Sequence, residues 1–126
     1  MAMRLRYLAF LLIFFALMIG LGSLPGQADA LSARFGDKPL HLIAYVCCSV
    51  LCYRVWIAPR RQRILLTVAM IALLGLIDEG IQAALPYRNA SLVDWCFDLL
   101  AALISVSGLW LQESLSPLQN SHAKNQ

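Results

Sequence analysis

Four long apolar stretches, separated by short polar segments, constrain this chain more than any other feature of its sequence. They cover residues 7–21, 40–57, 64–85 and 92–111. A helix needs about 20 residues to cross a hydrocarbon core of about 30 Å, and a lone strand would leave backbone groups unpaired in lipid. We therefore predict an all-α, polytopic membrane protein with four transmembrane helices in a small bundle.

Composition supports this prediction and excludes an ordinary soluble domain. Of the 126 residues, 60% are hydrophobic and 13% are charged, and the charged share is about half that of a soluble domain. A soluble chain of this length could not bury so much apolar surface. We predict one transmembrane domain over residues 1–113, followed by a polar, frayed cytoplasmic tail over residues 114–126.

The distribution of basic residues predicts the orientation. With four helices, one side of the membrane holds seven basic residues, namely Arg4, Arg6, Arg54, Arg60, Arg61, Arg63 and Lys124. The other side holds three, namely Arg34, Lys38 and Arg88, together with every acid except Glu113. The positive-inside rule then predicts a multi-pass protein of the plasma (inner) membrane with both termini cytoplasmic.

The first apolar stretch has an alternative interpretation as a secretory signal. Basic residues precede it, and Ala28-Asp29-Ala30 resembles an A-x-A cleavage site. The distance from the apolar stretch to that site is long for cleavage, so we favour a retained helix. It carries no ionisable residue within its apolar part, and we expect it to be a scaffold packed through Ala9, Ala16 and Gly20.

The cysteines do not predict a metal site. All four lie in predicted membrane helices without a C-x-x-C pair or zinc-ribbon spacing, at Cys47, Cys48, Cys52 and Cys96. His41, Cys48 and Cys52 share a helix face, so a metal site is conceivable. The better explanation is that the cysteines are small, weakly polar residues that pack at a helix interface. We predict no metal and no cofactor.

Polar and small residues recur three and four positions apart on three of the predicted helices. The stripes are His41, Tyr45, Cys48 and Cys52; Ala72, Gly75, Glu79 and Gln82; and Asp94, Asp98, Ala101, Ser105 and Gly108. Small residues let membrane helices approach closely, and ionisable residues avoid lipid. The three stripes therefore predict one outward-facing polar pocket that contains His41, Glu79 and Asp94, with Arg88 paired to a carboxylate.

Charge balance and local signals refine this prediction. Five acidic residues lie toward the outer side of the predicted bundle with only three lysines or arginines, and the acids are Asp37, Asp78, Glu79, Asp94 and Asp98. Crowded, desolvated carboxylates hold a proton or bind a cation. Asp78 points about 100° away from Glu79 on a helix, so we expect it to be a bystander. Ser91-x-x-Asp94 resembles a capping box, which offers Asp94 a purely structural role.

The same residues, in this order, resemble the VanZ-like membrane protein family over residues 37–108. The resemblance rests on Asp37-Lys38-x-x-His41 with Tyr45, on Glu79-x-x-Gln82, and on Arg88, Ser91 and Asp94. The chain departs from the family pattern at three positions, which are Leu42, Asp98 and Ala101. The resemblance implies a bacterial four-helix envelope protein from a family named for low-level resistance to the glycopeptide teicoplanin.

Three functions remain open from the sequence. The first is binding of an amphiphilic or lipid-linked ligand through Asp37, Lys38, His41, Tyr45, Glu79, Gln82, Arg88, Asp94 and Asp98. The second is an acid/base enzyme on a lipid-linked substrate, with Glu79 or Asp94 as base or nucleophile and His41 as partner. The third is a small proton-coupled transporter, although its acidic residue would be expected in the first helix. A purely structural polar network is the remaining interpretation. We expect no nucleic-acid partner.

Overall fold

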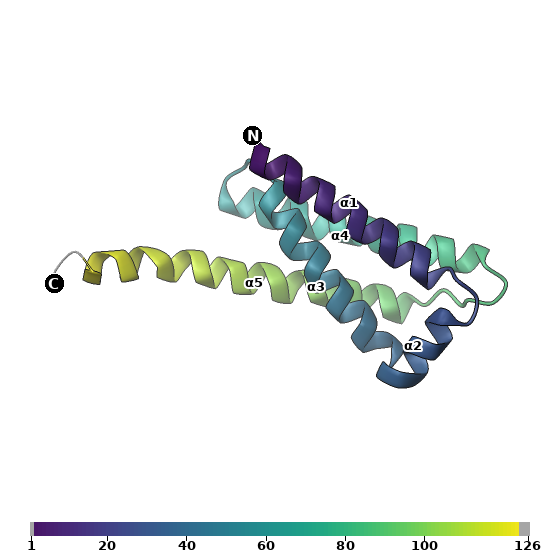
Figure 1. Cartoon of the computed structure of the whole chain (residues 1–126). Coiled ribbons are helices and arrows are strands. Elements are labelled where there is room, and N and C mark those ends of the chain that lie inside the picture. Colours follow the sequence, from purple (N-terminus) through teal and green to yellow (C-terminus); the bar gives the residue numbers. More distant parts are fainter. Residues whose placement is uncertain (1, 124–126) are drawn as a thin grey trace.

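The described backbone forms five helices. The computed structural model describes the backbone of residues 2–123, and the side chains of this range except 27–29 and 116–123. The helices are α1 (Ala2–Gly22), α2 (Gln27–Phe35), α3 (Asp37–Val55), α4 (Arg60–Ala84) and α5 (Leu92–Ala123) (Figure 1). No strand occurs among the described residues, so the all-α prediction is confirmed.

The short helix α2 was not expected from the sequence. It lies between two glycines with positive φ, Gly26 at 78° and Gly36 at 82°. Left-handed backbone is accessible to glycine without a Cβ clash, so each glycine reverses the chain where a helix ends or begins. The helix includes Ala30 of the A-x-A pattern; the side chains of Ala28 and Asp29 lie outside the described residues.

Helix α3 occupies the centre of the bundle. It packs against α1, α2, α4 and α5, and α4 also packs against α5. Figure 1 shows α3 crossing the long axis of α5. Because other helices surround α3, its inward face is buried in protein and need not be apolar enough for lipid.

Three helices are long and apolar enough to cross a membrane, counted over the described residues 2–123: Ala2–Gly22, Arg60–Ala84 and Leu92–Leu115. This finding indicates a membrane protein. The sequence predicted four such helices, and α3 is the one whose composition does not qualify. Its 19 residues include Asp37, Lys38 and Arg54, and its buried residues are mostly polar or cysteine.

Helix α1 meets the bundle through large side chains. Leu11 is its one described buried residue, and Phe14, Phe15 and Met18 pack around the same core. The predicted contacts through Ala9, Ala16 and Gly20 are wrong, since all three are exposed. Nothing lies within 4 Å of a Cβ built on Gly20. Bulky residues bridge a wider helix separation than a small-residue stripe would require.

Helix α5 continues well past the end of its predicted apolar stretch. It projects beyond the other helices toward the C-terminus (Figure 1). The segment from Ser114, predicted to be frayed, is helical as far as Ala123. No glycine is present in this segment to end the helix. The predicted basic residue Lys124 lies outside the described residues.

Candidate functional site

The three polar stripes converge largely as predicted. Their buried members are His41, Tyr45, Cys48 and Cys52 on α3; Gly75, Glu79 and Gln82 on α4; and Asp94, Asp98, Ala101 and Ser105 on α5. Gly108, the last member of the α5 stripe, is exposed. The ionisable members gather where α3 and α5 begin and α4 ends, which we call the His41 end of the bundle.

The centre of this end is a buried pair. His41 Nδ1 lies 3.0 Å from Asp98 Oδ1, and Asp98 has no solvent exposure. A carboxylate on one ring nitrogen fixes the orientation of the imidazole and directs its other nitrogen. Asp98 is one of the departures from the VanZ-like pattern, and in this chain it positions His41.

A hydrogen-bonded chain runs from α3 through α4 to the α4–α5 loop. The Tyr45 hydroxyl donates to Asp78 Oδ2 at 3.2 Å, and Gln82 Nε2 donates to Asp78 Oδ1 at 3.1 Å. Arg88 Nη2 then donates to Gln82 Oε1 at 2.9 Å. Asp78 is therefore buried and central, and the prediction that it is a bystander is wrong. The faces of α4 toward α3 and toward α5 are both buried, so neighbouring residues both point inward.

Arg88 does not pair with a carboxylate as the sequence analysis expected. Among the described residues, no acidic oxygen lies within 4.0 Å of its guanidinium nitrogens. Its Nε is buried and makes no hydrogen bond. Arg88 is thus a partly buried cation with unused hydrogen-bonding capacity.

Glu79 has a structural role that the sequence assigned to Asp94. The Ser91 N–H donates to Glu79 Oε2, immediately before α5 begins. The Ser91 hydroxyl in turn accepts a hydrogen bond from the Asp94 N–H at 3.3 Å, as an N-cap does. Glu79 therefore completes the cap in place of Asp94, and the Asp94 carboxylate is left for other contacts. This makes Glu79 the weakest of the three candidate catalytic residues.

Helices α4 and α5 approach each other closely beside the His41–Asp98 pair. A Cβ built on Gly75 would lie 2.7 Å from Asp98 Oδ2 and 2.8 Å from Trp95 Cδ1. The Trp95 indole N–H donates to the Ala72 carbonyl oxygen at 3.0 Å. Gly75 thus leaves the space that Asp98 occupies beneath His41.

A cavity of about 210 Å³ opens beside the polar network. Its apolar wall includes Met18 and Leu21 of α1 and Leu31 of α2, and its polar wall comes from α3, α4 and the following loop. Of the predicted ligand-binding residues, five line it: Asp37, His41, Tyr45, Gln82 and Arg88. Lys38, Glu79, Asp94 and Asp98 lie outside its wall, so the predicted single pocket is divided.

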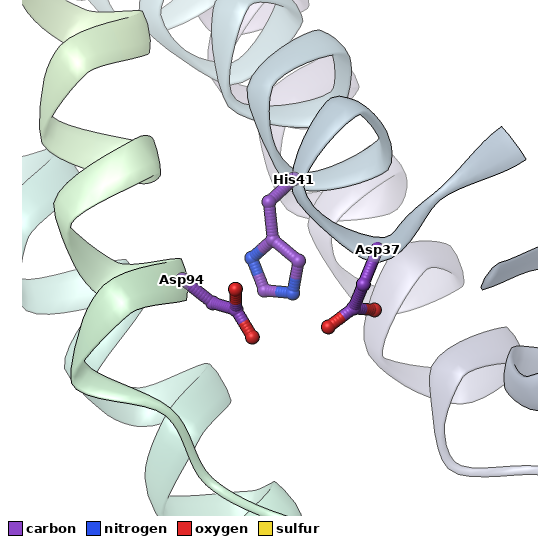
Figure 2. A group of neighbouring side chains, drawn as sticks. All are labelled: Asp37, His41 and Asp94. Carbon is purple, nitrogen blue, oxygen red and sulfur yellow. The ribbon is translucent and has the colours of Figure 1, made fainter.

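Asp37, His41 and Asp94 form a separate group at the edge of this cavity. One possible ligand atom from each residue lies within 4.8 Å of the other two. Figure 2 shows the His41 ring between the two carboxylates, with Asp37 on the same helix and Asp94 on α5. Asp37 also accepts a hydrogen bond from the Ser32 hydroxyl at 3.0 Å, and Lys38 Nζ lies 3.7 Å from Asp94 Oδ1. The sequence placed these three residues in one predicted pocket but did not single them out as a group, because their mutual distances depend on how α5 packs against α3.

The opposite end of the bundle carries a different cluster, which we call the Glu113 end. Arg63 Nη2 lies 2.8 Å and Arg60 Nε 3.3 Å from Glu113 Oε2. The Tyr53 hydroxyl donates to the same carboxylate at 3.2 Å, and the Arg63 guanidinium lies 4.6 Å from the centre of the Tyr53 ring. Here one acid meets two cations.

Comparisons with protein-family models, with curated proteins and with solved structures found no match for this chain. The resemblance to the VanZ-like family therefore remains a prediction that rests on the residue pattern alone.

Proposed function

We propose that the chain is a VanZ-like protein of the bacterial inner membrane with four transmembrane helices. Helix α3 has 19 residues, so it measures about 28 Å at 1.5 Å per residue, close to a hydrocarbon core. It packs between helices that do qualify as spans. Four spans place both termini on the same side, and the basic residues make that side cytoplasmic.

Single-cysteine labelling tests this topology. Ser23→Cys, Asn89→Cys and Ser121→Cys are introduced separately into a variant whose four native cysteines are alanine. An impermeant maleimide is expected to label positions 23 and 89 in intact cells, and position 121 only after the membrane is opened. Labelling of position 121 alone in intact cells contradicts the orientation. Labelling of positions 23 and 121 in intact cells, without labelling of position 89, is the pattern of three spans and contradicts α3 as a fourth span.

We further propose that the cavity at the His41 end binds the head group of an amphiphilic or lipid-linked ligand. The observation that supports this most is its two-sided wall, with apolar side chains from α1 and α2 facing polar ones from α3 and α4. Ligand sites combine an apolar lining with a few convergent polar groups. A volume of about 210 Å³ suits a head group, with the apolar chain lying along α1.

Arg88 gives this site its preference for an anionic head group. It lines the cavity and has a buried Nε without a hydrogen bond. Guanidinium groups bind phosphate and carboxylate through paired N–H donors. A lipid-linked phosphate or the carboxylate of a lipoglycopeptide would fill this unused capacity, which agrees with the teicoplanin connection implied by the family resemblance.

Binding of a polyprenyl phosphate and of teicoplanin to the reconstituted protein tests the proposal. Arg88→Gln is expected to weaken binding by roughly 10- to 100-fold, since a hydrogen bond to a charged group contributes about 1.5–3 kcal/mol. Arg54→Gln is the matched control, because Arg54 is exposed and far from the cavity. Ala44→Phe, which fills the cavity, should also abolish binding. Equal affinity in the wild type and both cavity variants would contradict the proposal.

A further inference from the structure

We propose that Asp37, His41 and Asp94 bind a divalent transition-metal cation of the zinc or manganese class. One imidazole nitrogen and two carboxylate oxygens form a donor set that suits these ions. Asp37 and His41 are four residues apart on α3, so both side chains lie on one helix face. Asp94 approaches from the first turn of α5 and closes the group (Figure 2).

The orientation of His41 supports a ligand at its second nitrogen. Nδ1 is occupied by Asp98 at 3.0 Å, and Nε2 makes no hydrogen bond to the described residues. Figure 2 shows the ring placed with one nitrogen toward the space between the two carboxylates. Histidines that bind metals typically donate their other ring N–H to a carboxylate, which fixes the ring and raises its basicity. Asp98 provides that carboxylate.

The Asp94 carboxylate supports the metal site independently of the His41 orientation. The residue is only 3% exposed, yet its Oδ1 makes no hydrogen bond. The N-cap hydrogen bond that would have used this carboxylate is made by Glu79. Buried carboxylate oxygens without donors are costly and rare in native proteins. A bound cation at this position would satisfy Asp94 Oδ1.

The geometry requires only a small closure. Two ligands of a tetrahedral zinc ion lie roughly 3.4 Å apart, and the three ligand atoms lie within 4.8 Å of one another. Asp37 is only partly buried and is the first residue of its helix, so its side chain has room to make the required movement of at most about 1.4 Å. Lys38 lies 3.7 Å from Asp94 Oδ1 with its side chain half exposed, so it can turn to solvent when a metal replaces it.

Three protein ligands leave at least one coordination position open. Asp37 and His41 both line the cavity, so that position faces the space proposed for the head group. The metal site itself does not depend on the identity of that ligand, because binding of the ion is measured alone.

Metal binding to the purified, untagged full-length chain tests this inference. The protein in detergent is dialysed against Zn²⁺ or Co²⁺ and its metal content is measured, together with the visible spectrum of bound Co²⁺ and the Zn²⁺ affinity by calorimetry. We expect a single equivalent in the wild type, lost in His41→Gln and in Asp94→Asn. Asp98→Asn should retain the ion with affinity weakened by about 10- to 100-fold, as for other residues that orient a metal ligand.

Controls separate this site from other donors. Glu113→Gln removes a carboxylate at the opposite end and should bind the ion like the wild type. The same is expected of Cys47→Ser/Cys96→Ser, which removes the exposed thiols, and of His122→Gln. If His41→Gln does not fold, Asp37→Asn at the helix start provides the same test. Absence of stoichiometric binding in the wild type, or binding that survives in the Asp37, His41 and Asp94 variants, would overturn the inference.

Discussion

The two ends of the bundle place ionisable residues in opposite circumstances. At the Glu113 end, one carboxylate meets Arg60, Arg63 and the buried Tyr53 hydroxyl, and the three charged side chains remain partly exposed. At the His41 end, Asp78, Glu79, Asp94 and Asp98 are all buried, while the nearest firm cations are Lys38 and Arg88. Several of their polar atoms have no hydrogen bond, including Glu79 Oε1, Asp94 Oδ1 and Asp98 Oδ2.

The difference indicates what each end does. Paired, partly exposed charges contribute little to stability, and at the Glu113 end every charged group has an oppositely charged partner, although the buried Arg63 Nε makes no hydrogen bond. Buried charges without matched partners cost free energy, and proteins retain such groups mainly where they serve function. The Glu113 end therefore has the features of a structural contact between α3, α4 and α5, and the His41 end has those of the binding site that we propose. The variants below test this contrast, beginning with the largest expected effect.

Gly75→Leu should have the largest effect. Its Cβ alone would lie within 3 Å of Asp98 Oδ2 and Trp95 Cδ1, so the added side chain must push α4 and α5 apart. We expect a loss of more than about 3 kcal/mol of unfolding free energy, measured by thermal or denaturant unfolding in detergent. Gly108→Leu is the matched control, because nothing lies within 4 Å of its Cβ. Equal stability of the two variants would show that α4 and α5 are not in close contact at the His41 end.

Asp98→Ala should have the next largest effect. It removes the partner of His41 Nδ1 and leaves a buried imidazole nitrogen unsatisfied, which costs about 1–3 kcal/mol. Asp98→Asn keeps an acceptor oxygen for Nδ1 and should be clearly more stable than Asp98→Ala in the same unfolding assay. If both variants are as stable as the wild type, the His41–Asp98 pair does not hold the site together.

Glu113→Gln should cost less, about 1 kcal/mol or below, because its ion pairs are partly exposed. Exposed pairs are screened by salt, whereas buried ones are affected much less. The wild type should therefore lose a small part of its stability between low and high NaCl concentrations, and Glu113→Gln should lose none. A salt response that persists in Glu113→Gln but disappears in Asp98→Asn would reverse the assignment of the two ends.

Glu79→Gln should have the smallest effect. The glutamine carbonyl oxygen can still accept the Ser91 N–H, and interhelical hydrogen bonds in membranes contribute only about 0.6 kcal/mol. Glu79→Ala removes the acceptor and should cost about 1 kcal/mol, as the loss of a helix cap does. Melting temperatures in detergent distinguish the two. A large loss in Glu79→Gln with little further loss in Glu79→Ala would show that the charge of Glu79, not its cap, matters.

The sequence by itself determined the elements and most of the inward-facing residues. Apolar stretches set the four long helices within about five residues at every end except the C-terminal end of α5, which continues to Ala123, since a helix in lipid must be apolar over its exposed length. The three- and four-residue spacing identified His41, Glu79 and Asp98 as buried, because polar side chains avoid lipid. The limits of this reasoning appear at α2, whose two glycines are weak signals, and at α1, which uses Phe14 and Met18 in place of small residues.

Only the tertiary structure decided which partner each polar residue has. Periodicity gives the face of a helix but neither the neighbour that covers it nor the height at which they meet. That is why Asp78, on a second covered face of α4, was expected to be a bystander, and why Glu79 took the cap predicted for Asp94. It is also why Asp37, His41 and Asp94, which the sequence placed in one predicted pocket, were not singled out as a group. Two of its members share a helix, but the third lies more than 50 residues away, and only the packing of α5 against α3 brings it within reach.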